Sequence, residues 1–265
     1  MNILITGCSG FIGKELASFL DSTPHTVFPT SRKNLDVSNE GEVNAFFQKY
    51  KIDVVVHAAI KGGRRNQPDS IEDLLENLKM FNNLYQQNDR YKLMISFGSG
   101  AEQNLESYYG VAKNAMAKEI EKHNDNIINM RLFGCFGPSE NSDRFIKNSV
   151  NQLLKGRHAI VHQNKYMDYF YIEDLNAVVL HYIDNYNDSL PRVLDLCYDN
   201  KVTLLHIAEK IKKLTNSTLD VIVENDKFGS SYIGNPSALS TLNIKLSGLN
   251  EGIKRTFNIL KAKNE

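Results

Sequence analysis

The sequence predicts an α/β fold in which a doubly wound parallel sheet, covered by helices on both faces, precedes a smaller C-terminal lobe. Short apolar runs rich in β-branched residues alternate with amphipathic helical segments through residues 1–133. The first of these runs leads directly into a glycine-containing turn and a helix. With 265 residues, of which 42% are hydrophobic, the chain can build one large sheet and its core.

The regular first part of the chain contains the sheet. Its expected strands are 2–6, 26–30, 53–58, 91–97 and 127–133. Helices are expected over 14–20, from a start near 38–39, from a start near 70, and over 106–122. Ser38 or Asn39 and, in the next helix, Ser70 are suitable N-cap residues, and apolar residues recur at helical spacing after each of them.

The pattern is less regular after residue 133. We expect a helix near 144–154, short strands near 159–162, 193–197 and 219–223, and helices through 204–211 and 249–260. The chain therefore divides into a first domain, residues 1–133, with later contributions from about 159–197, and a smaller interleaved lobe, residues 134–265.

The composition argues against several classes of function. Lys and Arg together number 31, as do Asp and Glu, so the net charge is zero. This balance argues against non-specific nucleic-acid binding and against a polybasic membrane arm. The sequence has neither an apolar run of roughly 20 residues nor a secretory signal, so we expect no membrane association and a cytoplasmic location. The three cysteines are widely spaced and predict reduced thiols, and no metal site is expected.

The segment 6–13, Thr-Gly-Cys-Ser-Gly-Phe-Ile-Gly, joins the first strand to its helix. In such a turn one glycine allows a tight reversal, one lets the backbone approach a pyrophosphate, and one allows close helix packing. Amide groups at the helix N-terminus then face the anion. This placement predicts a Rossmann-type dinucleotide-binding domain, with a binding loop that contains Gly7, Ser9, Gly10, Phe11, Ile12 and Gly13.

The end of the second strand indicates which dinucleotide binds. NAD sites usually place an acidic side chain here to hold the ribose 2′-hydroxyl. Residues 30–33 read Thr-Ser-Arg-Lys instead, and no carboxylate follows until Asp36. Ser31 and Arg32 suit a 2′-phosphate, so the pattern favours NADP(H), with NAD(H) as the alternative. A solvated basic turn is the other interpretation of these residues.

Ser99, Tyr109 and Lys113 form a candidate catalytic set. Tyr109 and Lys113 are four residues apart, and this spacing places them on one face of a helix. A nearby cation favours the phenolate form of a tyrosine, which proton transfer requires. Ser99 follows the fourth strand, at the sheet edge where open α/β folds bind ligands.

Several short motifs follow one another in order along the chain: TGCSGFIG (6–13), LDV (35–37), HAA (57–59), FGSG (97–100), YGVAK (109–113), RLFGCFGP (131–138), DYFYIEDL (168–175) and GLNEGIK (248–254). On these motifs the chain resembles an extended short-chain dehydrogenase/reductase of the NAD-dependent epimerase/dehydratase family. The segment HAAIKGG (57–63) further resembles the nucleotide-sugar reductase branch that includes GDP-fucose synthase and GDP-deoxymannose reductase.

The resemblance implies roles for these residues. Tyr109 exchanges a proton with the sugar oxygen, Lys113 holds the nicotinamide ribose, and Ser99 polarises the carbonyl. It further implies that the dinucleotide contacts Asp36, Val37, Ala58, Ala59 and Asn77. A homodimer that pairs through the helices at 70–86 and 106–122 is also implied.

Some positions depart from the family pattern. The dehydratases carry an Asp-Glu pair where Gly100 and Ala101 stand, and Glu102 is expected on an extended segment pointing to the other face. The cysteine and histidine that GDP-fucose synthases use for epimerisation correspond to Ala101 and Arg144. Carbonyl reduction and C4 epimerisation, which need only Ser99, Tyr109 and Lys113, are therefore the reactions that fit.

The sequence indicates the residues that would bind the substrate less clearly than those that would bind the dinucleotide. Many relatives place an arginine where Met167 stands, which leaves Arg144 and Lys165 as candidate diphosphate ligands or as ordinary surface cations. We expect an NADPH-dependent reductase of a keto (deoxy)sugar nucleotide, with surface polysaccharide biosynthesis as the family context. An NAD-dependent C4 epimerase is the close alternative, and a non-catalytic NAD(P) sensor is the alternative from another class.

Overall fold

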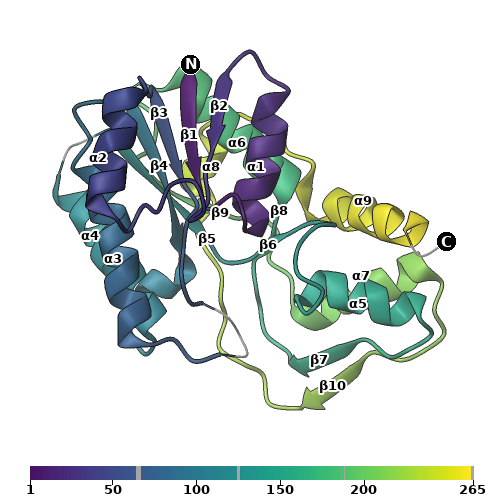
Figure 1. Cartoon of the computed structure of the whole chain (residues 1–265). Coiled ribbons are helices and arrows are strands. Elements are labelled where there is room, and N and C mark those ends of the chain that lie inside the picture. The colour runs from purple at the N-terminus through teal and green to yellow at the C-terminus, as the bar shows by residue number, and fades with distance from the viewer. Residues whose placement is uncertain (64–66, 124–125, 188, 264–265) are drawn as a thin grey trace. The chain divides into compact units, whose positions relative to one another are not determined.

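A computed structural model describes residues 1–63, 67–123, 126–187 and 189–263 (Figure 1). These residues form two compact units: Met1–Arg131 with Val178–Leu194, and Leu132–Ala177 with Asp195–Glu265. The large sheet has the strand order β2 (Thr26–Pro29), β1 (Asn2–Thr6), β3 (Val54–His57), β4 (Leu93–Ser99), β5 (Ile127–Leu132) and β9 (Val193–Leu196).

The sheet is doubly wound, as predicted. β1 pairs in parallel with both β2 and β3, and β3 pairs in parallel with β4. β2 and β3 therefore lie on opposite sides of β1 in the sheet. The crevice at such a switch point, beyond the carboxyl ends of the strands, is the usual ligand site of open α/β sheets. The topology places the ends of β1 and β3 at that site.

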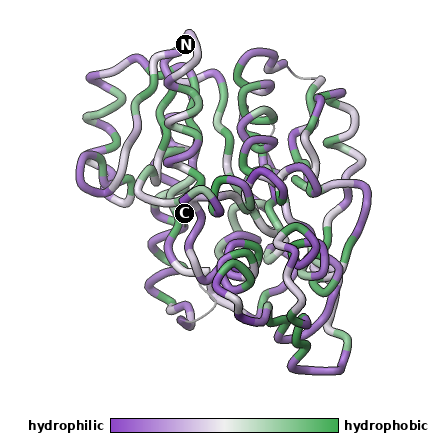
Figure 2. Tube along the Cα trace, turned by 90° about the vertical axis from the view of Figure 1, so that its right-hand side faces the viewer, coloured by the Kyte–Doolittle hydropathy of each residue, from purple (hydrophilic) through white to green (hydrophobic). Residues whose placement is uncertain are grey.

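Helices cover the sheet of the first unit, with α2, α3 and α4 on one side and α1 on the other (Figure 1). They are α1 (Phe11–Asp21), α2 (Glu40–Lys49), α3 (Ile71–Tyr85) and α4 (Tyr108–Lys122). Leu4, Val55 and Met94 point from the strands into the core beneath α2, α3 and α4. Their neighbours along the strands are equally buried, so both faces of the sheet are covered. Figure 2 shows the corresponding alternation of hydrophobic and hydrophilic residues along the helices.

Local caps fix where these helices begin. The Asn39 side chain accepts a hydrogen bond from the Glu42 amide, which selects Asn39 as the cap of α2. Ser70 and Asp73 form a reciprocal capping box at the start of α3, as the sequence indicates. α4 begins at Tyr108 and not at residue 106, because the Ser107 side chain accepts from the Gly110 amide and caps the helix there.

The segment after β4 differs from its prediction. β4 extends to Ser99, and a single 3₁₀ turn, η1 (Gly100–Gln103), follows it where an extended segment was expected. The turn forms because the Ser99 hydroxyl accepts from the Ala101 amide while the Glu102 carboxylate accepts from the Ser99 amide. Glu102 therefore lies in a turn and not on an extended segment, and its carboxylate contacts the Ser99 amide.

The second unit contains two small parallel ladders, β7 with β10 and β6 with β8. β10 lies about three residues later than the expected strand at 219–223. Asp174 links two helices, since its carboxylate accepts from the Ser247 and Gly248 amides at 2.7 and 2.9 Å. The remaining elements are β6 (Cys135–Phe136), α5 (Phe145–Leu154), β7 (Ile160–Gln163), β8 (Phe170–Tyr171), α6 (Ile172–Asn185), α7 (Leu204–Thr215), β10 (Ile222–Asn225), α8 (Ser237–Ser240) and α9 (Gly248–Ala262).

Within the described ranges, no helix has both the length and the apolar character needed to cross a membrane. The same residues contain no cluster of three or more side chains suited to hold a metal ion.

Candidate active site

The loop between β1 and α1 is packed so closely that two of its glycines have no room for a side chain. Gly7 has a φ of +73°, and a Cβ there would lie 2.6 Å from the Ala59 nitrogen. A Cβ on Gly13 would lie 2.5 Å from the Gly7 oxygen. The Gly10 amide donates to that same oxygen at 2.9 Å, which closes the turn. The glycines therefore bring the backbone of the turn against both α1 and the end of β3.

The N-terminus of α1 is suited to an anion. Whereas Asn39, Ser70 and Ser107 cap α2, α3 and α4, no side chain among the described residues caps α1, and its N-cap position is Gly10. Helix N-terminal amides that lack a protein acceptor, together with the positive end of the helix dipole, bind phosphate groups well. Ser9, Phe11 and Ile12 belong to this same loop and first turn.

Two consecutive hydrogen bonds join the end of β3 to the end of β1, beside the glycine turn. The Ala59 amide donates to the Thr6 hydroxyl at 3.1 Å, and the Thr6 oxygen lies 2.9 Å from His57 Nδ1. Burial, aided by the charge of Lys113, lowers the pKa of His57 to about 3. His57 is therefore neutral, and its Nδ1 shares a hydrogen bond with the Thr6 hydroxyl. This chain holds Ala58 and Ala59 against Gly7.

Asn77 holds the loop that follows β3. Its Oδ1 accepts from the Lys61 amide and its Nδ2 donates to the Lys61 oxygen, both at 2.8 Å. The side chain is almost fully buried, with 1% of its surface exposed. The Asn77 side-chain amide is therefore engaged with the protein backbone and holds this loop in place.

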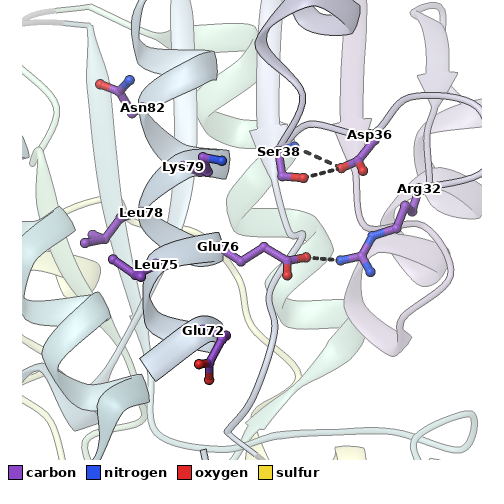
Figure 3. A pocket seen from close by; sticks show the side chains of 9 residues that line it. All are labelled: Arg32, Asp36, Ser38, Glu72, Leu75, Glu76, Leu78, Lys79 and Asn82. Carbon is purple, nitrogen blue, oxygen red and sulfur yellow. Dashed lines mark hydrogen bonds and ion pairs between the residues drawn. The ribbon is translucent and has the colours of Figure 1, made fainter. Parts of the chain in front are cut away.

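A cavity of about 750 Å³ opens between the segment after β2 and α3 (Figure 3). It is lined by Arg32, Asp36, Ser38, Glu72, Leu75, Glu76, Leu78, Lys79 and Asn82. Arg32 forms an ion pair with Glu76, which also accepts from Lys61 Nζ at 2.6 Å. Burial tends to raise the pKa of Asp36, but hydrogen bonds from Ser38 keep it below its usual value. Asp36 is therefore an anion beside the predicted phosphate-binding arginine.

Two other predicted residues at this end of the sheet have structural partners. The Ser31 amide donates to Asn34 Oδ1 at 2.7 Å and shapes the turn that presents Arg32. Val37 is buried, and its oxygen accepts from Asn83 Nδ2 at 3.0 Å.

Lys113 lies buried between Tyr109 and the end of β4. Its Nζ donates to the Phe97 oxygen at 2.5 Å and lies 5.9 Å from the centroid of the Tyr109 ring. Burial lowers the pKa of Lys113 to about 8, and the charge of Glu102 opposes that decrease. The Tyr109 ring lies against the backbone of Gly63, where an added Cβ would come within 3.0 Å of the ring. The protein thus fixes the ring and the ammonium side by side.

Ser99 begins the η1 turn, which packs against α4. Its side chain is buried, and its hydroxyl accepts from the Ala101 amide at 3.1 Å. The main-chain oxygen of Glu102 accepts a hydrogen bond from Asn114 Nδ2 at 2.9 Å. This bond attaches the turn to α4, the helix that carries Tyr109 and Lys113. Glu102 itself was not predicted as a site residue. The signal that could have found it is the capping-box pattern Ser-x-x-Glu over residues 99–102.

The two predicted substrate cations belong to the second unit, whereas every predicted dinucleotide and catalytic residue belongs to the first. Arg144 is the N-cap of α5 and faces Glu140, a buried carboxyl group. Burial raises the pKa of Glu140 to about 8, against the opposing charges of Arg144 and Lys147. Lys165 Nζ lies 6.0 Å from the centroid of the Tyr232 ring.

The doubly wound sheet, the glycine turn and the Ser99, Tyr109 and Lys113 arrangement define a Rossmann protein of the short-chain dehydrogenase/reductase class. Comparison with known families agrees and is more specific. The chain belongs to the NAD dependent epimerase/dehydratase family, whose model matches residues 3–197.

Individual relatives are more distant. GDP-L-colitose synthase from Yersinia pseudotuberculosis is 25% identical over 130 residues, which cover 47% of this chain and 42% of that protein. The alignment thus spans less than half the length of this relative.

Solved structures share the fold along nearly the whole chain, and two of them illustrate the range of activities. GDP-mannoheptose C4 reductase from Campylobacter jejuni with NADP bound has 18% identity and a TM-score of 0.82, with 99% of this chain and 98% of that chain covered. UDP-glucose 4-epimerase from Thermus thermophilus in complex with NAD has 16% identity and a TM-score of 0.78, with 98% of this chain and 99% of that chain covered.

Proposed function

We propose that the protein is an NADPH-dependent reductase of a nucleotide-linked keto sugar, with a keto deoxysugar nucleotide as the substrate class. The observation that carries this proposal is the buried Lys113 ammonium beside the Tyr109 ring, on a helix joined to the Ser99 turn. These groups share one unit with the glycine turn and the uncapped α1 N-terminus. The GDP-sugar relatives named above support the substrate class.

The glycine turn fits a dinucleotide. Gly7 and Gly13 leave the backbone bare where a Cβ would collide, and the α1 amides face the same turn. The reduced form, NADPH, would supply the hydride when bound there. The residues proposed to hold it are Gly7, Gly10 and Gly13 at the pyrophosphate and Lys113 at the nicotinamide ribose.

The three catalytic side chains divide the work of carbonyl reduction. The Ser99 hydroxyl donates a hydrogen bond to the carbonyl oxygen of the sugar and polarises it. The Tyr109 phenol transfers its proton to that oxygen as the hydride reaches the carbon. The Lys113 ammonium stabilises the phenolate that remains, since a buried cation interacts strongly with a neighbouring anion.

The preference for NADP(H) is part of the proposal and depends on Arg32. Its guanidinium lines the cavity between α3 and the segment after β2, and 63% of its side-chain surface is exposed. An exposed ion pair such as Arg32–Glu76 contributes roughly 0–1 kcal/mol, so a 2′-phosphate can replace the glutamate at little cost. The NADP-bound reductase from Campylobacter jejuni supports this choice.

A nucleotide-sugar C4 epimerase that retains NAD is the second candidate, because the same three catalytic side chains suffice for it and a solved epimerase shares the fold. A reductase consumes NADPH stoichiometrically, whereas an epimerase regenerates its cofactor in each turnover. A non-catalytic NAD(P) sensor would retain its cofactor and turn over neither substrate.

Turnover of defined substrates separates these candidates. The purified protein is incubated with NADPH and GDP-4-keto-6-deoxymannose, and in parallel with UDP-glucose and NAD, and the products are separated by chromatography. We expect NADPH oxidation with the keto sugar, abolished in Tyr109→Phe and retained in Tyr108→Phe, a control on the exposed side of α4. Interconversion of UDP-glucose without net cofactor consumption would favour the epimerase. Activity that persisted in Tyr109→Phe would refute the proton-transfer role.

We further propose that the protein is a cytoplasmic homodimer that acts in polysaccharide biosynthesis. Apolar residues of α3 support the dimer, because Ile71 and Leu75 are 51% and 55% exposed. The GDP-sugar relatives support the pathway, and three free cysteines fit a reducing compartment.

A further inference from the structure

One carboxylate of α3 holds two cations that come from two different strand ends. Glu76 Oε1 forms an ion pair with Arg32, which follows β2, and Glu76 Oε2 lies 2.6 Å from Nζ of Lys61, which follows β3. The Glu76 side chain is 21% exposed, whereas those of Arg32 and Lys61 are 63% and 39% exposed. Figure 3 shows Glu76 reaching from α3 toward Arg32. Each oxygen of this carboxylate therefore serves one cation.

Lys61 has further contacts that hold it in place without Glu76. The Asn77 side chain binds both the amide and the oxygen of Lys61, each at 2.8 Å. Lys61 Nζ also lies 3.5 Å from Asp73 Oδ1, on the preceding turn of α3. Asp73 is itself fixed by the capping box that it forms with Ser70. Lys61 is therefore a cation at a set position, and Glu76 connects it to Arg32.

Glu76 stands where an anion of a ligand would bind. A dinucleotide in a Rossmann fold places its adenosine ribose at the end of the second strand, near which Arg32 lies. Phosphate and carboxylate oxygens accept the same hydrogen bonds from arginine and lysine. A 2′-phosphate that binds the Arg32 guanidinium must therefore displace Glu76 from it or lie beside a like charge. Either alternative costs binding free energy.

The 2′-hydroxyl of NADH does not meet this cost. NAD sites usually offer that hydroxyl an acidic side chain at the end of the second strand, and the carboxylate accepts its hydrogen bond. Residues 30–33 contain no carboxylate, so α3 supplies the acid that lies closest to Arg32 in the network. Glu76 therefore opposes the phosphate of NADPH and tolerates the hydroxyl of NADH.

The other acids that line the cavity are engaged differently. Asp36 accepts from the amide and the hydroxyl of Ser38 at 3.0 and 2.7 Å. Glu72, one turn before Glu76, points away from Arg32 in Figure 3. Among the residues that the structure describes, only Glu76 forms ion pairs with both Arg32 and Lys61.

We propose that Glu76 is a specificity-determining residue of the dinucleotide site: its carboxylate competes with the 2′-phosphate of NADP(H) for Arg32 and Lys61 and limits the preference for NADPH over NADH. The inference rests on the proposed function, because it takes Arg32 as the residue that binds the phosphate. It adds Lys61 as a second phosphate ligand and Glu76 as the competitor of that phosphate.

The test is a titration of the full-length protein with NADPH and with NADH, followed by nicotinamide fluorescence at low and at high salt. Glu76→Gln removes the charge and keeps the length of the side chain. Glu72→Gln removes a charge from the same cavity one turn earlier on α3 and is the matched control. Lys61→Gln removes the second cation. The Tm of each variant establishes that it is folded.

We expect Glu76→Gln to bind NADPH about 3- to 10-fold more tightly than wild type does, and to bind NADH no more tightly. The gain should become smaller at high salt, because the competing groups are partly exposed to solvent. Lys61→Gln should weaken the binding of NADPH and leave that of NADH unchanged. Glu72→Gln should match wild type with both dinucleotides.

The outcomes separate this inference from the proposed function, since the titration requires no turnover. An NADPH affinity that is unchanged in Glu76→Gln, or raised equally in Glu72→Gln, would overturn the competition even if wild type is an active reductase. NADH binding that tightens by the same factor would also overturn it, because the effect would not depend on the 2′-phosphate. A preference for NADPH that appears only in Glu76→Gln would support the competition even if wild type binds both dinucleotides equally.

Discussion

Alanine in place of Gly13 tests the geometry on which the dinucleotide site depends. The new methyl group would lie 2.5 Å from the oxygen and 2.7 Å from the carbonyl carbon of Gly7, both backbone atoms that cannot rotate away. Such overpacking costs roughly 1–3 kcal/mol, and the better helix propensity of alanine returns at most about 1 kcal/mol. Because the clash involves two backbone atoms, we expect a cost at the upper end of this range and a net loss of about 1–2 kcal/mol, which lowers the Tm by roughly 2–8 °C in a protein of this size.

The same displacement should weaken dinucleotide binding. Movement of the Gly7 peptide away from the pyrophosphate loses at least one charge-assisted hydrogen bond, worth about 1.5–3 kcal/mol. NADPH should therefore bind about 10- to 100-fold more weakly to Gly13→Ala, as measured by nicotinamide fluorescence.

Gly41→Ala is the matched control, because Gly41 also lies in the first turn of a helix and its Cβ would approach Asn39 Oδ1 only to 3.4 Å. This variant should keep the Tm and the NADPH affinity of wild type. Wild-type Tm and affinity in Gly13→Ala would refute the close packing of the turn on α1.

Three further perturbations test other parts of the molecule. His57 has a pKa of about 3 because of burial and the charge of Lys113, against 6.5 as its ordinary value, so the unfolded chain binds the extra proton between these pH values. The free energy of unfolding of wild type should therefore fall as the pH falls from 6.5 toward 3, and His57 contributes a limiting slope of about 1.4 kcal/mol per pH unit. Urea unfolding measured across this pH range should show a smaller slope for His57→Gln. An equal slope in both proteins would contradict the neutral His57. Ser70→Ala removes the capping box of α3 and should cost about 1 kcal/mol in urea unfolding, so an unchanged midpoint would contradict its role as a cap. Leu75→Lys places a charge on the exposed apolar face of α3 and should therefore convert the proposed dimer into monomers, as measured by analytical ultracentrifugation. Finding that the wild-type protein is itself a monomer would contradict the proposed dimer.

The sequence predicts the first unit well because its signals are local. Strand β1, the glycine turn and α1 follow one another without a gap, and the caps of α2 and α3 are adjacent to the helices that they start. The spacing of Tyr109 and Lys113 likewise depends on a single helix. Such features require no knowledge of which distant segments meet.

The features that sequence analysis missed depend on distance or on very short elements. The ion pair between Arg32 and Glu76 joins residues 44 positions apart, and no local pattern indicates it. β6 and β8 have two residues each, too few to show an alternating pattern. Glu102 was placed on an extended segment because a single 3₁₀ turn is too short for helical periodicity, and only its capping-box spacing reveals it.

The central claim is that the glycine turn and Arg32 form an NADP(H) site, and titration of the protein with NADPH and NADH tests it most directly. Nicotinamide fluorescence reports binding cleanly because the chain contains no tryptophan. We predict tighter binding of NADPH than of NADH, a preference that Arg32→Ala reduces by about 10- to 100-fold and that Lys33→Ala, at an exposed neighbour, leaves intact. Equal affinity for both dinucleotides would contradict the role of Arg32 and favour the epimerase, and binding of neither would contradict the site itself.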